Sequence, residues 1–243
     1  LVVMTTNDYG YQAAIDWADA GRNVVAIVDT REVATGDLVE EARKRGLNII
    51  PGSAVIEVQG SKRVTSVSVA DLNADGTKIA GSVTKLKADT VATSGGWSPV
   101  IHLSCHTGSR PVWDDTVVGF LPGPTVQKQL TAGGINGQYQ TEVVLQEGLI
   151  AGQKALAEVG LAAVDVVLPT VKALNITAPM SLFHIPHLKP TSQAPKQFVD
   201  YQTDVTAAGI EIACREGFEA IEHVKRYTAM GFGTDQGKLG NIN

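Results

Sequence analysis

Three glycines in front of a long apolar helix form the strongest candidate for a ligand site in this sequence. Gly133, Gly134 and Gly137 follow a short strand pattern near Phe120 and precede small and aliphatic residues that run to Leu161. A glycine turn lets the backbone approach a ligand closely, and the first amides of a helix have no partner inside the helix. Because the helix dipole also favours negative charge at that end, we expect this turn to bind a phosphate.

The start of the chain has the pattern of another nucleotide site, with part of its chemistry missing. A β-branched strand leads into Thr5-Thr6-Asn7-Asp8-Tyr9-Gly10, where the dinucleotide fingerprint G-x-G-x-x-G keeps only its third glycine. Asp29 ends the next strand, where an acid that binds ribose would stand. Thr5 and Asn7 argue against close approach of a pyrophosphate, so we expect a retained fold with a dead or reduced site. Arg31 leaves phosphate binding open, although a solvated arginine after a strand is the simpler interpretation.

These candidate sites are carried by alternating strand and helix patterns. LVVMT, NVVAIV and LNII are predicted strands, and residues 88–97 are predicted to return to the same parallel sheet. Residues 54–87 predict an antiparallel meander. Helices are predicted over 11–20 and 37–45, and the first is expected to bury one face made of Ala13, Ala14, Trp17 and Ala18. The pattern is that of an α/β, Rossmann-like nucleotide-binding layer fold.

Residues 196–243 predict two short helices between polar loops, and the segment resembles a small 2Fe-2S domain. Such a module opens with Cys-x-Cys and carries Cys-x-x-Cys after a Gly-Met-Gly-like turn. Here Asp200 and Gln202 occupy the first pair of positions, and Gly233-Thr234-Asp235-Gln236-Gly237 fills the later loop. An iron-sulfur cluster needs thiolate ligands, so this segment cannot hold one.

Composition limits the function classes further. The chain has 243 residues and a net charge of -5, which provides no basic face for nucleic acid or anionic lipid. No apolar run is long enough to span a bilayer, and Cys105 and Cys214 offer no disulfide framework. We therefore expect a cytoplasmic protein without nucleic-acid or membrane partners. Leu1 lies in a strand already under way, so we also expect an internal section of a longer chain.

The late glycine turn resembles that of the two-dinucleotide-binding flavoprotein fold, in which one nucleotide domain is inserted into another. That fold carries Ala-Gly-Asp at this place, and the aspartate holds the ribityl chain of FAD. Ala132-Gly133-Gly134 lacks the carboxylate. The resemblance implies a site that has changed its ligand from FAD to NAD, or one that binds nothing.

Longer strings make the resemblance specific. TTNDYGYQAAIDWADAG, SGGWSPVIHL, AGGINGQYQT, FVDYQTDVTAAGI and HVKRYTAMGFGTDQGKLGNIN are similar to the alpha subunit of heterotetrameric sarcosine oxidase. The resemblance covers essentially the whole chain and is strongest after Lys196. In that family the alpha subunit binds NAD, carries a cluster-less helical module and ends in a domain that handles tetrahydrofolate. The beta subunit holds FAD and oxidises sarcosine, and an FMN at the alpha/beta boundary passes electrons to oxygen.

The resemblance assigns residues to two cofactors. For NAD the matched turn provides Gly134, Gly137, Tyr139 and Thr141, and a helix cap with ordinary packing is the alternative. For FMN the helical module provides Lys225, Arg226, Thr234 and Gln236. The alternative for that module is a solvated helix face whose Ile221 and Val224 are buried. The resemblance implies no catalytic residue and no metal ligand in this section.

We therefore divide the chain into a Rossmann-like domain with its meander (1–119), a return segment of a partial FAD/NAD-type domain (120–164), a proline-rich linker (165–195) and a cluster-less helical module (196–243). The expected function is support of the oxidative demethylation of sarcosine to glycine. Hydrogen peroxide is produced, and the one-carbon unit passes to tetrahydrofolate or leaves as formaldehyde. The expected partners are the beta, gamma and delta subunits. The alternatives are a subunit of a related amine, opine or proline dehydrogenase, and a redox-inert nucleotide-binding scaffold.

Overall fold

The computed structural model describes residues 1–243 and begins with a parallel sheet. Its four strands lie in the order β3-β2-β1-β7, with the bounds β1 Val2–Thr5, β2 Ala26–Asp29, β3 Ile49–Ile50 and β7 Val91–Ser94. Both neighbours of β1 run parallel to it, so the predicted return of the chain to this sheet is confirmed. The connecting helices are α1 (Tyr9–Asp19) and α2 (Asp37–Lys44).

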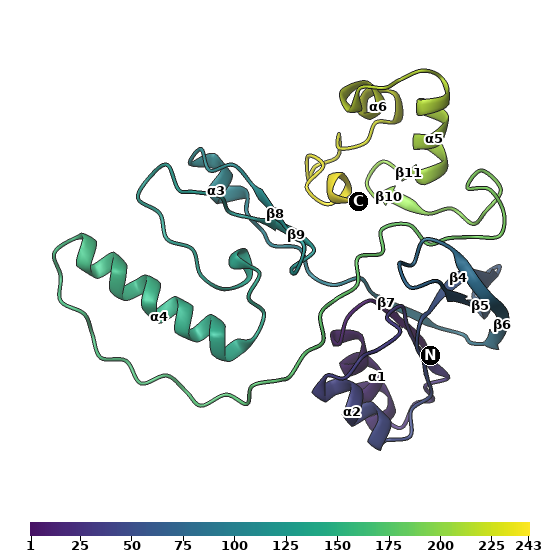
Figure 1. Cartoon of the computed structure of the whole chain (residues 1–243), viewed down its shortest axis with the longest axis horizontal. Helices are drawn as coiled ribbons and strands as arrows, with labels where there is room; N and C mark the ends of the chain where they lie inside the picture. Colours follow the sequence, from purple (N-terminus) through teal and green to yellow (C-terminus); the bar gives the residue numbers. More distant parts are fainter.

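The sheet lies between these helices and a three-stranded antiparallel meander (Figure 1). The meander strands are β4 (Ser53–Gly60), β5 (Val64–Leu72) and β6 (Ile79–Lys87), as predicted. Successive side chains of a strand point to opposite faces. Val3 of β1 therefore packs with Tyr11 and Val39 on the helix side, while Val2 packs with Val67 on the meander side. The α/β class of this part of the chain is confirmed.

Of the face predicted for helix α1, only Ala14 is buried. Tyr11, Ala14 and Ile15 are buried, whereas Ala13 is exposed and Trp17 is 39% exposed. The prediction placed the larger aromatic ring of Trp17 toward the core. Tyr11 takes that place because its hydroxyl group can donate a hydrogen bond to the buried carboxylate of Asp29 (2.7 Å).

The middle of the chain forms smaller elements outside this layered domain. They are α3 (His102–His106), the hairpin of β8 (Val112–Asp114) and β9 (Gly119–Leu121), the 3-10 turn η1 (Gly133–Asn136) and α4 (Thr141–Glu158). The strand, glycine turn and long helix predicted after Gly119 are thus confirmed. Helix α4 has no buried residue, and it lies apart from both sheets (Figure 1).

The connector after α4 contains no helix or strand until β10, and it runs back toward the first domain (Figure 1). The C-terminal module then consists of β10 (Phe198–Asp200), β11 (Val205–Thr206), α5 (Ala207–Arg215), α6 (Ile221–Thr228) and η2 (Gly240–Ile242). Thr206 caps α5 by accepting a hydrogen bond from the Gly209 amide (3.2 Å). Both predicted helices are present. The four-part division at residues 119, 164 and 195 stays a prediction.

Candidate functional site

The polar side chains of the turn between β1 and α1 point inward and form hydrogen bonds within the chain. The Thr5 hydroxyl group donates to the Asn7 carbonyl (2.6 Å), and the Asn7 side-chain amide donates to the Ser94 carbonyl (2.9 Å). Asn7 is only 4% exposed. These residues stand where the first two fingerprint glycines would be, and they tie β1 to β7. Gly10 is still required, because a Cβ atom there would lie 2.4 Å from Thr5 Oγ1.

The carboxylate expected to bind ribose is fully engaged inside the protein. Asp29 is buried and accepts hydrogen bonds from the Tyr11 hydroxyl group (2.7 Å) and from Arg31 Nε (3.0 Å) and Nη2 (2.7 Å). Burial is the largest cause of the raised pKa of Tyr11, and the charge of Asp29 adds to it. No oxygen of Asp29 is left facing solvent for a ribose hydroxyl group.

Arg31 completes this network and is not the solvated residue that the sequence suggested. It is 6% exposed, and its Nη1 also pairs with the buried carboxylate of Asp8 (2.7 Å). Burial by itself would lower the pKa of Arg31, but Asp29 and Asp8 outweigh it and raise the pKa. The charged groups of the first turn therefore bind one another: one guanidinium group lies between two buried carboxylates.

The second turn, before α4, is held by its own glycines and by one carboxylate. Glu147 accepts hydrogen bonds from the Gly133 amide (2.7 Å) and from Asn136 Nδ2 (3.1 Å). Gly137 has a left-handed φ of 73°, and a Cβ atom there would lie 2.6 Å from Val117. At Gly134 an added Cβ would meet only Tyr139 at 3.6 Å, so packing inside this chain does not require that glycine.

Tyr139 gives this second turn a feature that the first lacks. Its hydroxyl oxygen is buried and has no hydrogen-bond partner. Burial is the largest cause of the raised pKa of Tyr139, and the neighbouring Tyr9 adds to it. Thr141 is the first residue of α4 and is exposed, and no side chain caps that helix. A buried hydroxyl group without a partner is costly, which makes this position suited to a ligand that supplies one.

Trp97 joins the two turns, and the sequence reasoning did not select it. Its ring lies 6.1 Å from Tyr9 in an edge-to-face arrangement and 6.2 Å from Tyr139. Trp97 is 60% exposed, so one aromatic surface is open for a planar ring to stack upon. Its position could have been noticed in the sequence, because Gly95-Gly96-Trp97 follows β7 directly. Ligands of parallel sheets bind beyond the carboxyl ends of the strands.

The loops that hold cluster cysteines in the resembled 2Fe-2S module converge in this chain. Gln202 Oε1 accepts hydrogen bonds from the Thr234 hydroxyl group (3.1 Å) and from the Asp235 amide (3.4 Å). Asp200 is buried and accepts the Gly231 amide (2.8 Å), which is the largest cause of its lowered pKa. No group of three His, Cys, Asp or Glu side chains in the structure could hold a metal ion. Side-chain and backbone hydrogen bonds thus connect the two loops.

The four residues assigned to FMN differ in what they contact. Lys225 Nζ lies 3.6 Å from Glu222, and Arg226 is exposed without an ion pair. Thr234 is engaged by Gln202. Gln236 alone among the four lines a hollow of about 300 Å³ between α3 and the C-terminal loop. Ile221, which the alternative interpretation placed in the core, is 62% exposed, whereas Val224 is buried as expected.

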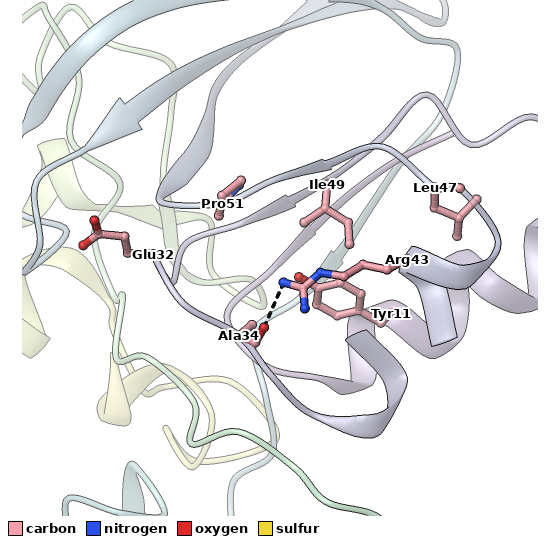
Figure 2. Close-up of a pocket in the computed structure, with 8 residues that line it drawn as sticks. Tyr11, Glu32, Ala34, Arg43, Leu47, Ile49 and Pro51 are labelled. Atoms are coloured by element: carbon pink, nitrogen blue, oxygen red, sulfur yellow. Dashed lines mark hydrogen bonds between the residues drawn. The ribbon is translucent and has the colours of Figure 1, made fainter. Parts of the chain in front are cut away.

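Another hollow, of about 370 Å³, lies beside β3 (Figure 2). Leu47, Ile49 and Pro51 line it together with Arg43, which donates a hydrogen bond to the Ala34 carbonyl (3.2 Å). Tyr11 also borders it, with its hydroxyl group already bonded to Asp29. This hollow was not predicted.

The layered first domain followed by a strand, a glycine turn and a helix defines a class: the fold of nucleotide-binding oxidoreductases. The structure is similar to thioredoxin reductase from T. acidophilum, with a TM-score of 0.51 and 20% identity over 65% of this chain and 52% of that one. It is also similar to L-proline dehydrogenase from P. horikoshii, with a TM-score of 0.53 and 18% identity over 99% of this chain and 43% of that one. At these identities the likeness shows the fold alone.

Sequence comparison is more specific. The chain is 35% identical over 242 residues to sarcosine oxidase subunit alpha of Rhizobium meliloti (strain 1021), covering 99% of this chain and 23% of that protein. It is 32% identical over 247 residues to the same subunit of Corynebacterium sp. (strain P-1), covering 25% of that protein. Residues 194–243 match the family model described as the sarcosine oxidase A3 domain. The resemblance to the sarcosine oxidase alpha subunit is confirmed, and the chain spans about a quarter of the length of these relatives.

Proposed function

We propose that this chain is a nucleotide-binding and scaffolding section of a sarcosine oxidase alpha subunit. The assembly would demethylate sarcosine oxidatively to glycine, release hydrogen peroxide, and pass the one-carbon unit to tetrahydrofolate or release it as formaldehyde. The observation that carries the proposal is the 35% identity that extends over 242 residues, together with the A3-domain match at residues 194–243. We assign no catalytic residue to this section, and the beta subunit with its FAD would perform the oxidation.

NAD is the proposed ligand of the second turn, held by Gly134, Gly137, Tyr139 and Thr141. Three features support a nucleotide there: the uncapped start of α4, the buried Tyr139 hydroxyl group without a partner, and the exposed ring of Trp97. The helix start would attract a phosphate, Tyr139 would donate or accept one hydrogen bond, and Trp97 would stack on a planar ring.

FMN at the boundary with the beta subunit is the proposed neighbour of the C-terminal module. When bound there, this flavin would pass electrons to oxygen. Arg226 is exposed and has no ion pair, so its guanidinium group is available for a flavin phosphate. Lys225 is partly neutralised by Glu222, and Thr234 and Gln236 would offer neutral hydrogen bonds.

The decisive experiment assembles the full-length parent with its beta, gamma and delta subunits and follows hydrogen peroxide on addition of sarcosine. Peroxide production that depends on sarcosine is the expected result. Activity on another amine without activity on sarcosine would contradict the proposal. In the same assembly, Arg226→Ala should slow peroxide release from sarcosine relative to Arg215→Ala, a matched change at another exposed arginine without an ion pair. Equal rates of peroxide release in the two variants would remove the FMN assignment.

A dehydrogenase subunit is the second candidate, because the fold likeness to L-proline dehydrogenase extends over 99% of this chain. Such an enzyme would reduce an artificial dye with proline or an opine as substrate and would form no peroxide. A redox-inert nucleotide-binding scaffold is the remaining alternative. It would show neither peroxide nor dye reduction in the assembled complex while still binding NAD.

A further inference from the structure

The carboxyl edge of the first parallel sheet is covered by a distant part of the same chain. Residues 174–180 of the connector cross the ends of β1 and β2 in an extended path. The Thr177 amide donates to Asp8 Oδ2 (2.8 Å), and the Met180 amide donates to the Thr6 carbonyl (2.9 Å). Both acceptors belong to the turn in which a dinucleotide fingerprint would bind pyrophosphate.

The same segment reaches the loop after β2. Arg31 Nη1 donates to the carbonyl groups of Thr177 (3.4 Å) and Ala178 (3.3 Å). The Thr35 amide donates to the Thr177 hydroxyl group (3.0 Å). Asp37 at the start of α2 donates its amide to the Asn175 carbonyl (2.8 Å), and its carboxylate accepts the Asn175 amide (3.2 Å). Backbone amide and carbonyl groups of the segment therefore bond both to the turn between β1 and α1 and to the loop between β2 and α2.

Local residue choice allows this close approach. A Cβ atom at Gly36 would lie 1.8 Å from Asp8 Oδ2 and 2.9 Å from the Asn175 carbonyl oxygen. Gly36 has a φ of -69°, so its backbone does not require glycine, but the close packing of Asp8 and of the segment against it does. Leu182 and Ile185, just beyond the segment, pack against the core cluster between the sheet and the meander.

We infer that the nucleotide-facing edge of the first sheet is an intramolecular docking site, and that its ligand is the 174–180 segment. The buried carboxylate of Asp8 supplies the negative charge that a phosphate would bring, and Arg31 binds the segment's carbonyl groups together with two carboxylates. The edge binds a peptide of its own chain where a dinucleotide fingerprint would bind pyrophosphate. It thereby fixes the middle of the connector that leads to the C-terminal module.

Hydrogen–deuterium exchange on the full chain tests this assignment. The amides of Thr177 and Met180 should exchange about tenfold or more slowly than those of Val166 and Val167, which are exposed in the same connector. Equal rates would overturn the inference. Adding NAD or ADP should leave the exchange of Thr177 and Met180 unchanged. Faster exchange with either nucleotide would show that the edge binds nucleotides in competition with the segment, which would also overturn the inference.

Two substitutions make the test specific to the contacts. Thr177→Pro removes the amide that donates to Asp8, so exchange at Met180 should accelerate about tenfold, while Val167→Pro in the exposed part should leave it unchanged. Gly36→Ala should loosen the segment from the other side, and Gly148→Ala, with open space around it, is the matched control. Unchanged exchange of the segment in both Thr177→Pro and Gly36→Ala would refute the docking site.

Discussion

The two strand–turn–helix motifs of this molecule differ in what their polar groups already bind. At the first turn, Asp8, Asp29 and Arg31 form a buried network, and the 174–180 segment bonds to Asp8 and Arg31. At the second turn, the Tyr139 hydroxyl group is buried without a partner. A glycine fingerprint therefore says less about binding than whether the polar groups of the turn are satisfied within the chain.

Arg31→Ala should break the first turn with the largest effect on stability. The change leaves two buried carboxylates without a counter-charge, which costs about 3–5 kcal/mol. Urea unfolding of the first domain measures the loss. Arg22→Ala removes an exposed arginine that makes no ion pair and should change stability by less than about 0.5 kcal/mol. Similar losses in both variants would mean that the buried network does not hold this turn together.

Gly137→Ala should distort the second turn with a smaller but clear cost. The residue has a left-handed φ of 73°, and the new Cβ would lie 2.6 Å from Val117. We expect a loss of about 1–2 kcal/mol from the backbone alone, measured by urea unfolding, together with weaker NAD binding in calorimetry. Gly148→Ala, within α4 and surrounded by open space, should instead stabilise by about 0.5–1 kcal/mol. A neutral Gly137→Ala variant would contradict the described turn.

Tyr139→Phe sharpens the comparison because it should weaken NAD binding without lowering the stability of the folded chain. Removing a buried hydroxyl group without a partner should leave stability unchanged or raise it. If that hydroxyl group bonds to NAD, the Kd should rise about 2- to 12-fold, which corresponds to about 0.5–1.5 kcal/mol. Tyr201→Phe, at a residue that is 68% exposed, should change neither quantity. An unchanged Kd in the Tyr139 variant would remove this tyrosine from the NAD site.

Asp200→Asn extends the comparison to the C-terminal module with the smallest expected effect: the side chain keeps its shape, loses its charge and replaces one oxygen that accepts a backbone amide by an amino group. Backbone amides, first that of Gly231, hold the pKa of Asp200 below its ordinary value. A lowered pKa in the folded state means that the stabilisation is present above the unfolded pKa of about 3.9 and is lost as the pH falls through the folded value. Wild type should therefore be more stable than Asp200→Asn at pH 7, and the difference should shrink as the pH falls through the folded pKa of Asp200. A difference that persists unchanged in acid would rule out this charge effect.

The sequence predicted the layered domain well because its strands are β-branched runs separated by turn residues and amphipathic helices. It missed the buried face of α1, because the preference for Tyr11 over Trp17 depends on the carboxylate of Asp29 at the end of another strand. It also placed Arg31 in solvent, since the partners that bury it include Thr177, 146 positions along the chain. No local pattern reveals a partner at that distance.

The candidate sites were predictable to different degrees. The second turn could be found because its glycines and helix start are contiguous, whereas Trp97 joins it only through the parallel pairing of β7 with β1. In the C-terminal module the convergence of Asp200, Gln202 and the Thr234 loop agrees with the expected outline. The joint flavin site stays a prediction: Lys225 and Arg226 belong to α6, and Gln236 lines the hollow beside α3.

The contact between Arg31 and Thr177 sets an order for biosynthesis. During translation the last strand of the first sheet leaves the ribosome well before the covering peptide, because 83 positions separate Ser94, the end of β7, from Thr177. At about 5–20 residues per second this delay lasts roughly 4–17 s. Throughout that interval the nascent domain carries a charged cleft that is open to water and to any small anion, and closing it later requires ordering a long loop. The last step in maturation of the N-terminal layers is therefore made by residues that are synthesised long after them.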